Sequence, residues 1–195
     1  MNPDDVDDEP FLRSFLQTVS DAGCDTFIIH ARKAILEGLS PKENRSVPPL
    51  RYDLVAQMKT EFPHLNIILN GGIAEMEDVQ AHCKTFEGVM IGRKAYQTPY
   101  FLADIEQNIF KNTSILQRET VVQAMIPYIE RQQRDFDTPL KSVTRHMLGL
   151  FSGQPGAKAW KRHISEHAHK TENASELLNT ALSKALEGPK NRDAA

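Results

Sequence analysis

Three short apolar runs are spaced along the first half of the chain, and each ends in polar or glycine residues. They read T-F-I-I-H (26–30), N-I-I-L-N (66–70) and G-V-M-I-G (88–92). Short runs without strict alternation are typical of strands buried on both faces of a parallel sheet. We therefore predict three parallel strands.

Helical spacing of apolar residues separates these runs. A first helix begins near Pro10 and ends at Gly23, and a second begins near Leu50 and ends at Pro63. A third, shorter helix is predicted over residues 75–84. Strands that alternate with helices indicate parallel strands joined by right-handed crossovers.

The pattern changes after residue 98, because the apolar positions from there to residue 187 keep helical spacing and predict no strand. One helix is predicted around residues 143–150, and another starts near Ala157 after the turn S-G-Q-P-G. The predicted organisation is an α/β domain over 1–98, an all-helical domain over 99–188 and a disordered tail over 189–195.

The residues that follow the apolar runs carry the candidate chemistry. They are His30, Asn70, Gly71, Gly72, Gly92 and Arg93. In parallel α/β proteins, ligands bind beyond the carboxyl ends of the strands. Glycine lets backbone N–H groups approach an anion closely, and arginine pairs with phosphate through two hydrogen bonds. The repeated pattern favours a phosphate site over two unrelated turns, whereas for His30 a loop hydrogen bond is as good an interpretation as a ligand contact.

Positive charge is concentrated in two places, although the net charge of the chain is −3. The long loop between His30 and Leu50 carries Arg32, Lys33, Lys42 and Arg45. Residues 141–163 carry Lys141, Arg145, Lys158, Lys161 and Arg162 and no acidic residue. Local basic stretches suit phosphate contacts, and a solvated charged surface is the plain alternative.

Composition narrows the class of protein further. No apolar run approaches the ~20 residues that a membrane span needs. The two cysteines, Cys24 and Cys83, give neither a disulfide framework nor metal-ligand spacing. We predict a cytoplasmic protein without a membrane segment or a metal site, in which both cysteines are buried and reduced.

Four longer stretches together resemble one enzyme family. They are H-A-R-K-A-I-L-E-G-L-S-P-K-E-N-R, I-L-N-G-G-I, G-V-M-I-G-R-K-A-Y-Q-T-P-Y and T-R-H-M-L-G-L-F-S-G-Q-P-G-A-K-A-W-K-R-H. They closely resemble the tRNA-dihydrouridine synthases, specifically the A subfamily, over roughly residues 10–165. The resemblance implies a flavin-binding (β/α)₈ TIM barrel followed by a helical tRNA-binding domain. It also implies that FMN, reduced by NADPH, passes hydride to a uridine in the D-loop of tRNA.

The resemblance also assigns roles to individual residues. It implies that Asn70, Gly71, Gly72, Gly92 and Arg93 hold the FMN phosphate and that His30 contacts the flavin side of the site. Four basic residues match positions that touch tRNA in this subfamily, namely Lys42, Arg45, Lys158 and Lys161.

The chain departs from the family in length. A barrel needs eight strands. The resemblance implies five more βα units before the one that starts at residue 10, and it places the cysteine that protonates uridine C5 in those units. We therefore expect the C-terminal part of such an enzyme, without a catalytic residue of its own and inactive alone. Three strands would leave sheet edges unpaired and expose inner-face side chains, expected at Phe27, Ile29, Ile68 and Met90 or their neighbours.

Two other functions stay open. A non-catalytic tRNA-binding remnant would keep the basic helical domain and bind tRNA through phosphates. Another FMN- or phosphate-binding barrel oxidoreductase would share the glycine pattern but has no reason to carry S-P-K-E-N-R. The sequence leaves open the exact uridines and the oligomeric state.

Overall fold

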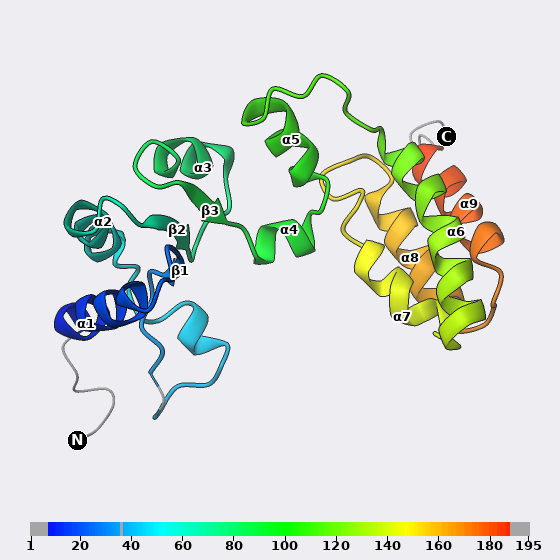
Figure 1. Cartoon of the computed structure of the whole chain (residues 1–195). Helices are drawn as coiled ribbons and strands as arrows, with labels where there is room; N and C mark the ends of the chain where they lie inside the picture. Colours follow the sequence, from blue (N-terminus) through cyan, green and yellow to red (C-terminus); the bar gives the residue numbers. More distant parts are fainter. Residues whose placement is uncertain (1–7, 36, 188–195) are drawn as a thin grey trace, which may run out of the picture. The chain divides into compact units, whose positions relative to one another are not determined.

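The protein is described by a computed structural model that covers residues 8–35 and 37–187, and the chain divides into two compact units (Figure 1). The first unit is Met1–Gly92 and the second is Arg93–Ala195. The predicted tail at 189–195 lies outside the described residues. None of the described helices is both long and apolar enough to cross a membrane.

The first unit is built on the predicted parallel sheet, which is confirmed. Strands β1 (Thr26–His30), β2 (Asn66–Asn70) and β3 (Gly88–Met90) lie in the order β1-β2-β3, and both pairs are parallel. His30 is paired in register with Asn70, and Asn70 with Met90. The carboxyl ends of all three strands therefore meet at one edge.

Helix α1 (Asp8–Asp21) precedes β1, α2 (Tyr52–Glu61) lies between β1 and β2, and α3 (Met76–His82) lies between β2 and β3. The first helix ends as predicted, because Gly23 with φ 98° takes the left-handed conformation that stops a helix. A capping box begins α3, in which the Glu75 and Asp78 side chains each accept a backbone N–H.

The two faces of the sheet differ in burial. Phe27 and Ile29 of β1 are buried, whereas Ile28 between them is 57% exposed. In β2 the buried residues are Ile67 and Leu69. The prediction is confirmed for Met90, which is 45% exposed, and for Ile28 as the neighbour of Phe27 and Ile29. It was wrong for Phe27 and Ile29 themselves, because an unbroken apolar run carries no alternation that identifies the covered face.

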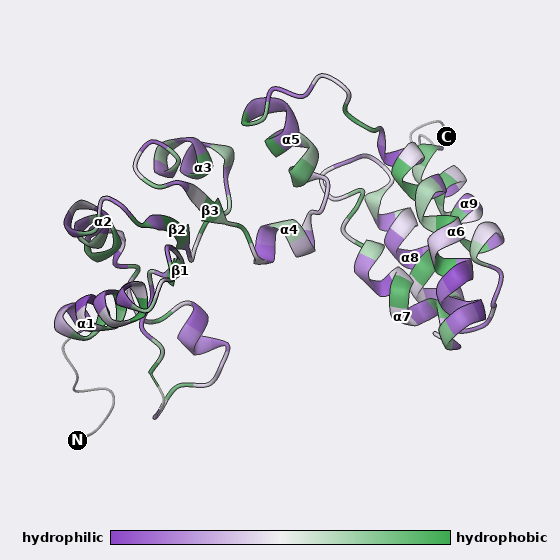
Figure 2. Cartoon of the chain, in the orientation of Figure 1, coloured by the Kyte–Doolittle hydropathy of each residue, from purple (hydrophilic) through white to green (hydrophobic). Residues whose placement is uncertain are grey.

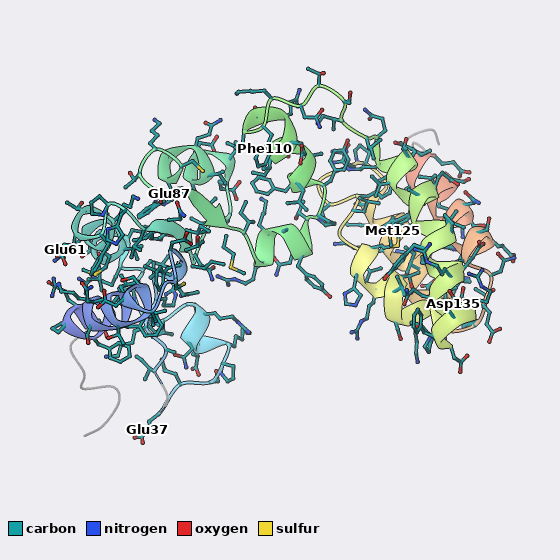
Figure 3. The ribbon with its side chains drawn as sticks, in the orientation of Figure 1. Glu37, Glu61, Glu87, Phe110, Met125 and Asp135 are labelled. Carbon is teal, nitrogen blue, oxygen red and sulfur yellow. The ribbon has the colours of Figure 1, made fainter. Side chains whose placement is uncertain are left out.

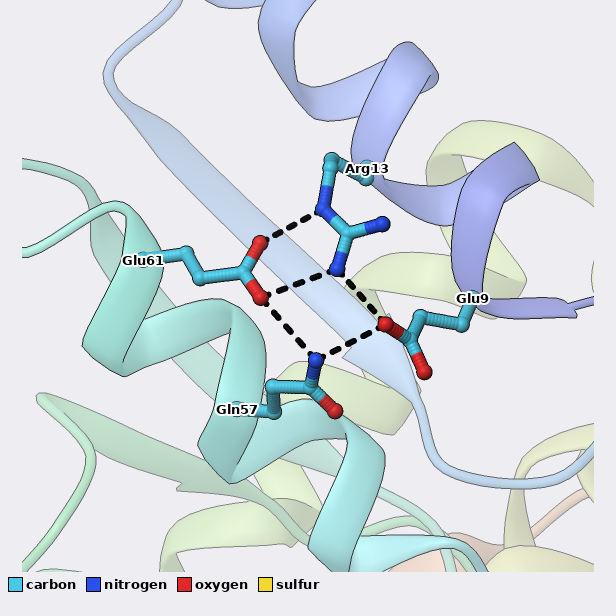
Figure 4. Close-up of polar contacts among 4 residues, drawn as sticks. All are labelled: Glu9, Arg13, Gln57 and Glu61. Carbon is cyan, nitrogen blue, oxygen red and sulfur yellow. Dashed lines mark hydrogen bonds and ion pairs between the residues drawn. The ribbon is translucent and has the colours of Figure 1, made fainter.

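A polar network joins α1 to α2 (Figure 4). The Arg13 guanidinium donates to Glu61 at 2.6 Å and 2.9 Å and to Glu9 at 2.6 Å. The Gln57 amide donates to Glu9 and Glu61, both at 2.9 Å. The hydrogen bonds from Arg13 and Gln57 lower the pKa of the Glu61 carboxyl to about 2, and the Arg13 bond has the larger effect. The network ties the first helix to the second at their surface.

The second unit contains only helices among its described residues. They are α4 (Arg93–Gln97), α5 (Phe101–Asn108), α6 (Arg118–Phe136), α7 (Leu140–Thr144), the 3₁₀ helix η3 (Arg145–Met147), α8 (Ala157–His167) and α9 (Ala174–Leu186). The helix predicted around 143–150 is thus a short α-helix that tightens into a 3₁₀ turn. The helix predicted near Ala157 is confirmed.

The core of this unit gathers around Trp160 of α8. Its indole is fully buried and donates to the carbonyl of Met147 at 3.0 Å, and its ring lies 4.8 Å from that of Phe151. Leu178 of α9 and Ile129 of α6 are also fully buried in the same cluster. Hydrophobic and hydrophilic residues alternate along these helices, as Figure 2 shows for α6 and α9.

Both cysteines lie at the surface, contrary to the prediction. Cys24 is in the turn between α1 and β1, and Cys83 caps the end of α3. Turns that follow helices run over the outside of a unit, and this location overrides the apolar character of a thiol. Glu87, labelled in Figure 3, lies at the same end of the sheet, where it pairs with Lys59 and accepts the N–H of Ile67 at 2.9 Å.

Candidate cofactor and nucleic-acid sites

His30 and Asn70 lie side by side at the carboxyl edge of the sheet. They are register partners on neighbouring parallel strands, and the N–H of Ala31 donates to the carbonyl of Asn70 at 2.8 Å. Both project to the same face as Ile28, because side chains alternate along a strand. The structure thus brings together two predicted site residues that are 40 positions apart in the chain.

The turn after β2 supplies backbone donors at this edge. Gly71 and Gly72 have φ values of 115° and 76°, which favour glycine. A Cβ on Gly72 would lie 2.6 Å from Leu50 Cδ1 and 2.7 Å from the Tyr52 hydroxyl. Within the described part of the chain, the N–H groups of Gly71 and Gly72 donate to no acceptor. Free, convergent N–H groups are what an anion requires.

Tyr52 holds this turn in place, and sequence analysis had not singled it out. Its hydroxyl donates to the carbonyl of Gly71 at 2.7 Å. Burial raises the pKa of the Tyr52 hydroxyl, so it stays protonated as a donor at neutral pH. The only sequence signal was its position at the start of a helix beside the glycine turn.

The His30 ring is fixed from one side. Its Nδ1 lies 3.1 Å from the backbone nitrogen of Arg32 and 3.2 Å from the carbonyl oxygen of the same residue. The opposite edge of the ring faces Gly71, since a Cβ there would be 3.2 Å from His30 Cε1. Nε2 has no hydrogen-bond partner among the described residues, so it can meet a ligand at the glycine turn.

Gly92 and Arg93 follow the third strand. β3 ends at Met90, the register partner of Asn70, and Gly92 comes two residues later with open space where a Cβ would lie. Gly92 is the last residue of the first unit and Arg93 the first of the second. Within the described residues, the Arg93 guanidinium forms no ion pair, so its charge is available to an anion.

Lys42 and Arg45 lie on a turn of the long loop that is held by hydrogen bonds. The 3₁₀ helix η2 (Glu43–Arg45) begins beside Ser40, whose hydroxyl donates to the Glu43 carboxylate at 2.6 Å. Asn44 pins the turn through two 2.7 Å bonds to the backbone of Ile35. In a 3₁₀ helix, side chains three residues apart share a face, so the two cations point the same way.

Lys158 and Lys161 are exposed on α8, three residues apart and therefore on one helix face.

A further concave, basic site lies beside that helix and had not been predicted. It is a cavity of about 370 Å³ whose lining includes Lys141 and Arg145. The sequence signal that pointed to this site was the absence of acidic residues from 141–163.

A parallel three-stranded sheet whose strands alternate with helices defines the class of the first unit as α/β. Comparison with known proteins gives the family. The profile described as dihydrouridine synthase (Dus) matches residues 3–187, so the chain belongs to the dihydrouridine synthase family. The predicted family is confirmed.

Individual relatives agree with this assignment. The chain is 51% identical over 183 residues to the tRNA-dihydrouridine(20/20a) synthase of Vibrio cholerae, covering 93% of this chain and 56% of that protein. It is 51% identical over 181 residues to the enzyme of the same name from Escherichia coli K12, covering 92% of this chain and 52% of that protein. The chain thus spans about half the length of the curated relatives it matches.

Proposed function

We propose that this chain supplies the FMN-phosphate site and tRNA contacts of a tRNA-dihydrouridine synthase of the A subfamily. The observation that carries the proposal is the gathering of His30, Asn70 and the free N–H groups of Gly71 and Gly72 at one sheet edge. Family membership over nearly the whole chain supports the choice of ligand.

The residues at this edge fit a phosphorylated flavin. The N–H groups of Gly71 and Gly72 would donate to the phosphate, and Arg93 would pair with it through two parallel hydrogen bonds. His30 would direct its free Nε2 toward the flavin and fix its orientation. FMN, when bound and reduced by NADPH, would supply the hydride that converts a D-loop uridine to 5,6-dihydrouridine.

The tRNA contacts are assigned to Lys42, Arg45, Lys158 and Lys161. All four are exposed, and none takes part in an ion pair among the described residues. Cations without an internal partner can bind phosphates without first breaking a contact. Reduction of a pyrimidine in folded RNA requires the base to leave its stack, so phosphate contacts must hold the RNA while the base is extruded.

We expect the 195-residue chain alone to form no dihydrouridine. The resemblance assigns protonation of uridine C5 to a cysteine. Cys24 precedes β1 and Cys83 ends α3, so both lie away from the carboxyl edge that holds His30 and Asn70. Dihydrouridine detected by mass spectrometry in tRNA incubated with the chain, FMN and NADPH would contradict this expectation.

The cofactor site is tested by comparing FMN with riboflavin, which lacks the phosphate. Arg93→Ala should weaken FMN binding by about tenfold or more, the effect of losing a charged hydrogen bond, and leave riboflavin binding unchanged. Arg134→Ala removes an exposed arginine elsewhere in the same unit and is the matched control. Equal losses for FMN and riboflavin, or no FMN binding by the chain, would refute the phosphate site.

A second candidate is a non-catalytic tRNA-binding protein, favoured by the unpaired lysines of α8. Here tRNA binding would persist without FMN. In a salt titration, Lys158→Ala with Lys161→Ala should reduce the slope of log affinity against log salt by about two. Salt-independent binding, or an unchanged slope, would remove these lysines from the interface.

A further inference from the structure

The basic cavity of the second unit has the composition of a nucleotide site. It lies between α7, η3 and α8, and its volume of about 370 Å³ is within the range of small-molecule pockets. Lys141, Arg145 and His169 line it, and none of its lining residues is acidic. Lys141 and Arg145 are four residues apart, so they stand on successive helical turns. The cavity therefore attracts an anion.

Arg145 is oriented before any ligand arrives. Its Nε donates to His146 Nε2 at 3.1 Å, and His146 Nδ1 lies 2.9 Å from the Tyr96 hydroxyl oxygen. Because Nε2 accepts, Nδ1 carries the proton and donates to Tyr96. Arg145 uses only its Nε in this contact, so the two terminal NH₂ groups remain for a phosphate. Such prior ordering lowers the entropy cost of binding.

The cavity also has an apolar wall, which an inorganic anion would not use. Leu148, Ile164 and Ala168 contribute to the lining, and Ile164 belongs to the core cluster around Trp160. A ligand that uses the whole lining combines a negative charge with an apolar body. A nucleotide does so, because its phosphate and its base are joined through the sugar.

The exposed face of α8 connects this cavity to the two lysines assigned to tRNA. Ser165 lines the cavity and follows Lys161 by four residues and Lys158 by seven, which places all three on one helix face. At 1.5 Å per residue, Lys158 and Ser165 are about 10 Å apart along the axis. An RNA strand on the lysines therefore reaches the cavity.

We propose that this cavity binds one nucleotide of an RNA, with its phosphate against Lys141 and Arg145 and its base against Leu148 and Ile164. The inference rests on the proposed function only in taking the nucleotide from tRNA. The nucleotide chemistry itself follows from the lining.

The test uses the full chain with ¹³C-labelled isoleucine methyl groups and follows the Ile164 signal by NMR. Uridine 5′-monophosphate should shift this signal saturably. Inorganic phosphate lacks the base and uridine lacks the phosphate, so each should bind at least about tenfold more weakly than the nucleotide. Phosphate that acts as strongly as the nucleotide would overturn the nucleotide site.

Four variants, one of them a control, locate the effect. Lys141→Ala and Arg145→Ala should each weaken uridine 5′-monophosphate by about tenfold. Arg131→Ala, on the exposed side of α6 and outside the cavity lining, is the matched control and should change nothing. Ser165→Phe keeps every charge but fills the cavity from an exposed position, so it should abolish the shift. Unchanged binding in Ser165→Phe would contradict the cavity as the binding place.

Competition with tRNA separates this inference from the proposed function. Displacement of uridine 5′-monophosphate from Ile164 by tRNA supports both. If tRNA binds but neither ligand moves the Ile164 signal, the cavity is refuted and the tRNA contacts stand. If the nucleotide shifts Ile164 but tRNA does not bind, the proposed tRNA contacts fail, and with them the RNA origin of the nucleotide.

Discussion

Gly156 should be one of the least replaceable residues of the second unit. It precedes α8 with φ 83°, and a Cβ at this position would overlap the carbonyl oxygen and the carbonyl carbon of Ala185 in α9. Gly153, three residues earlier in the same turn, has φ 80° but no atom within 4 Å of a Cβ. The two positions therefore share the backbone requirement and differ only in the contact.

This pair lets the two costs be separated. Alanine in the left-handed conformation costs roughly 1–2 kcal/mol, which Gly153→Ala should show alone. Overlap with packed backbone adds about 1–3 kcal/mol for Gly156→Ala, because α8 and α9 must move apart. With a urea slope of about 1–2 kcal/mol per M, the midpoint of Gly156→Ala should lie roughly 0.5–3 M below that of Gly153→Ala.

Trp160 makes the measurement specific to this unit. It is the single tryptophan of the chain and is fully buried in α8, so its fluorescence reports unfolding of the second unit. Urea titrations of the wild-type chain and both variants give the free energies of unfolding. Equal midpoints for the two variants would show that the contact with Ala185 does not limit the packing of α8.

Three further predictions concern packing and titration. Leu178→Ala should lower the free energy of unfolding of the second unit by about 2–5 kcal/mol, measured by Trp160 fluorescence in urea, because Leu178 is fully buried. Burial, and after it the nearby charge of Lys184, lowers the pKa of His163. The contribution of the neutral ring to the free energy of unfolding is therefore complete above the ordinary pKa of 6.5 and is lost as the pH falls below it. The melting temperature should therefore stay level from about pH 8 to pH 6.5 and fall on further acidification toward pH 5, and the fall should be smaller in His163→Asn. Glu61, with its pKa lowered from 4.5 to about 2, should stabilise the first unit fully above pH 4.5 and lose this effect toward pH 2. Circular dichroism should therefore show Arg13→Met and wild type converging in stability at the acid end.

The sequence by itself determined the elements and the place of the candidate site residues. Apolar runs located β1 and β2, and Gly23 and Pro63 located the ends of α1 and α2. Polar residues after these runs had to meet at one edge, because parallel strands share their direction. The neighbourhood of His30 and Asn70 was therefore accessible from the chain alone.

Only the tertiary structure decided which side chains are covered and which surfaces are concave. An apolar run such as T-F-I-I-H gives no alternation, so packing against helices selected Phe27 and Ile29 for burial and left Ile28 exposed. The cavity at Arg145 exists because α7 and η3 meet α8 there, and these elements are separated by a turn. The local pattern of a segment determines whether it forms a helix or a strand. Burial and cavity shape arise from contacts between segments, and no single stretch of sequence contains those contacts.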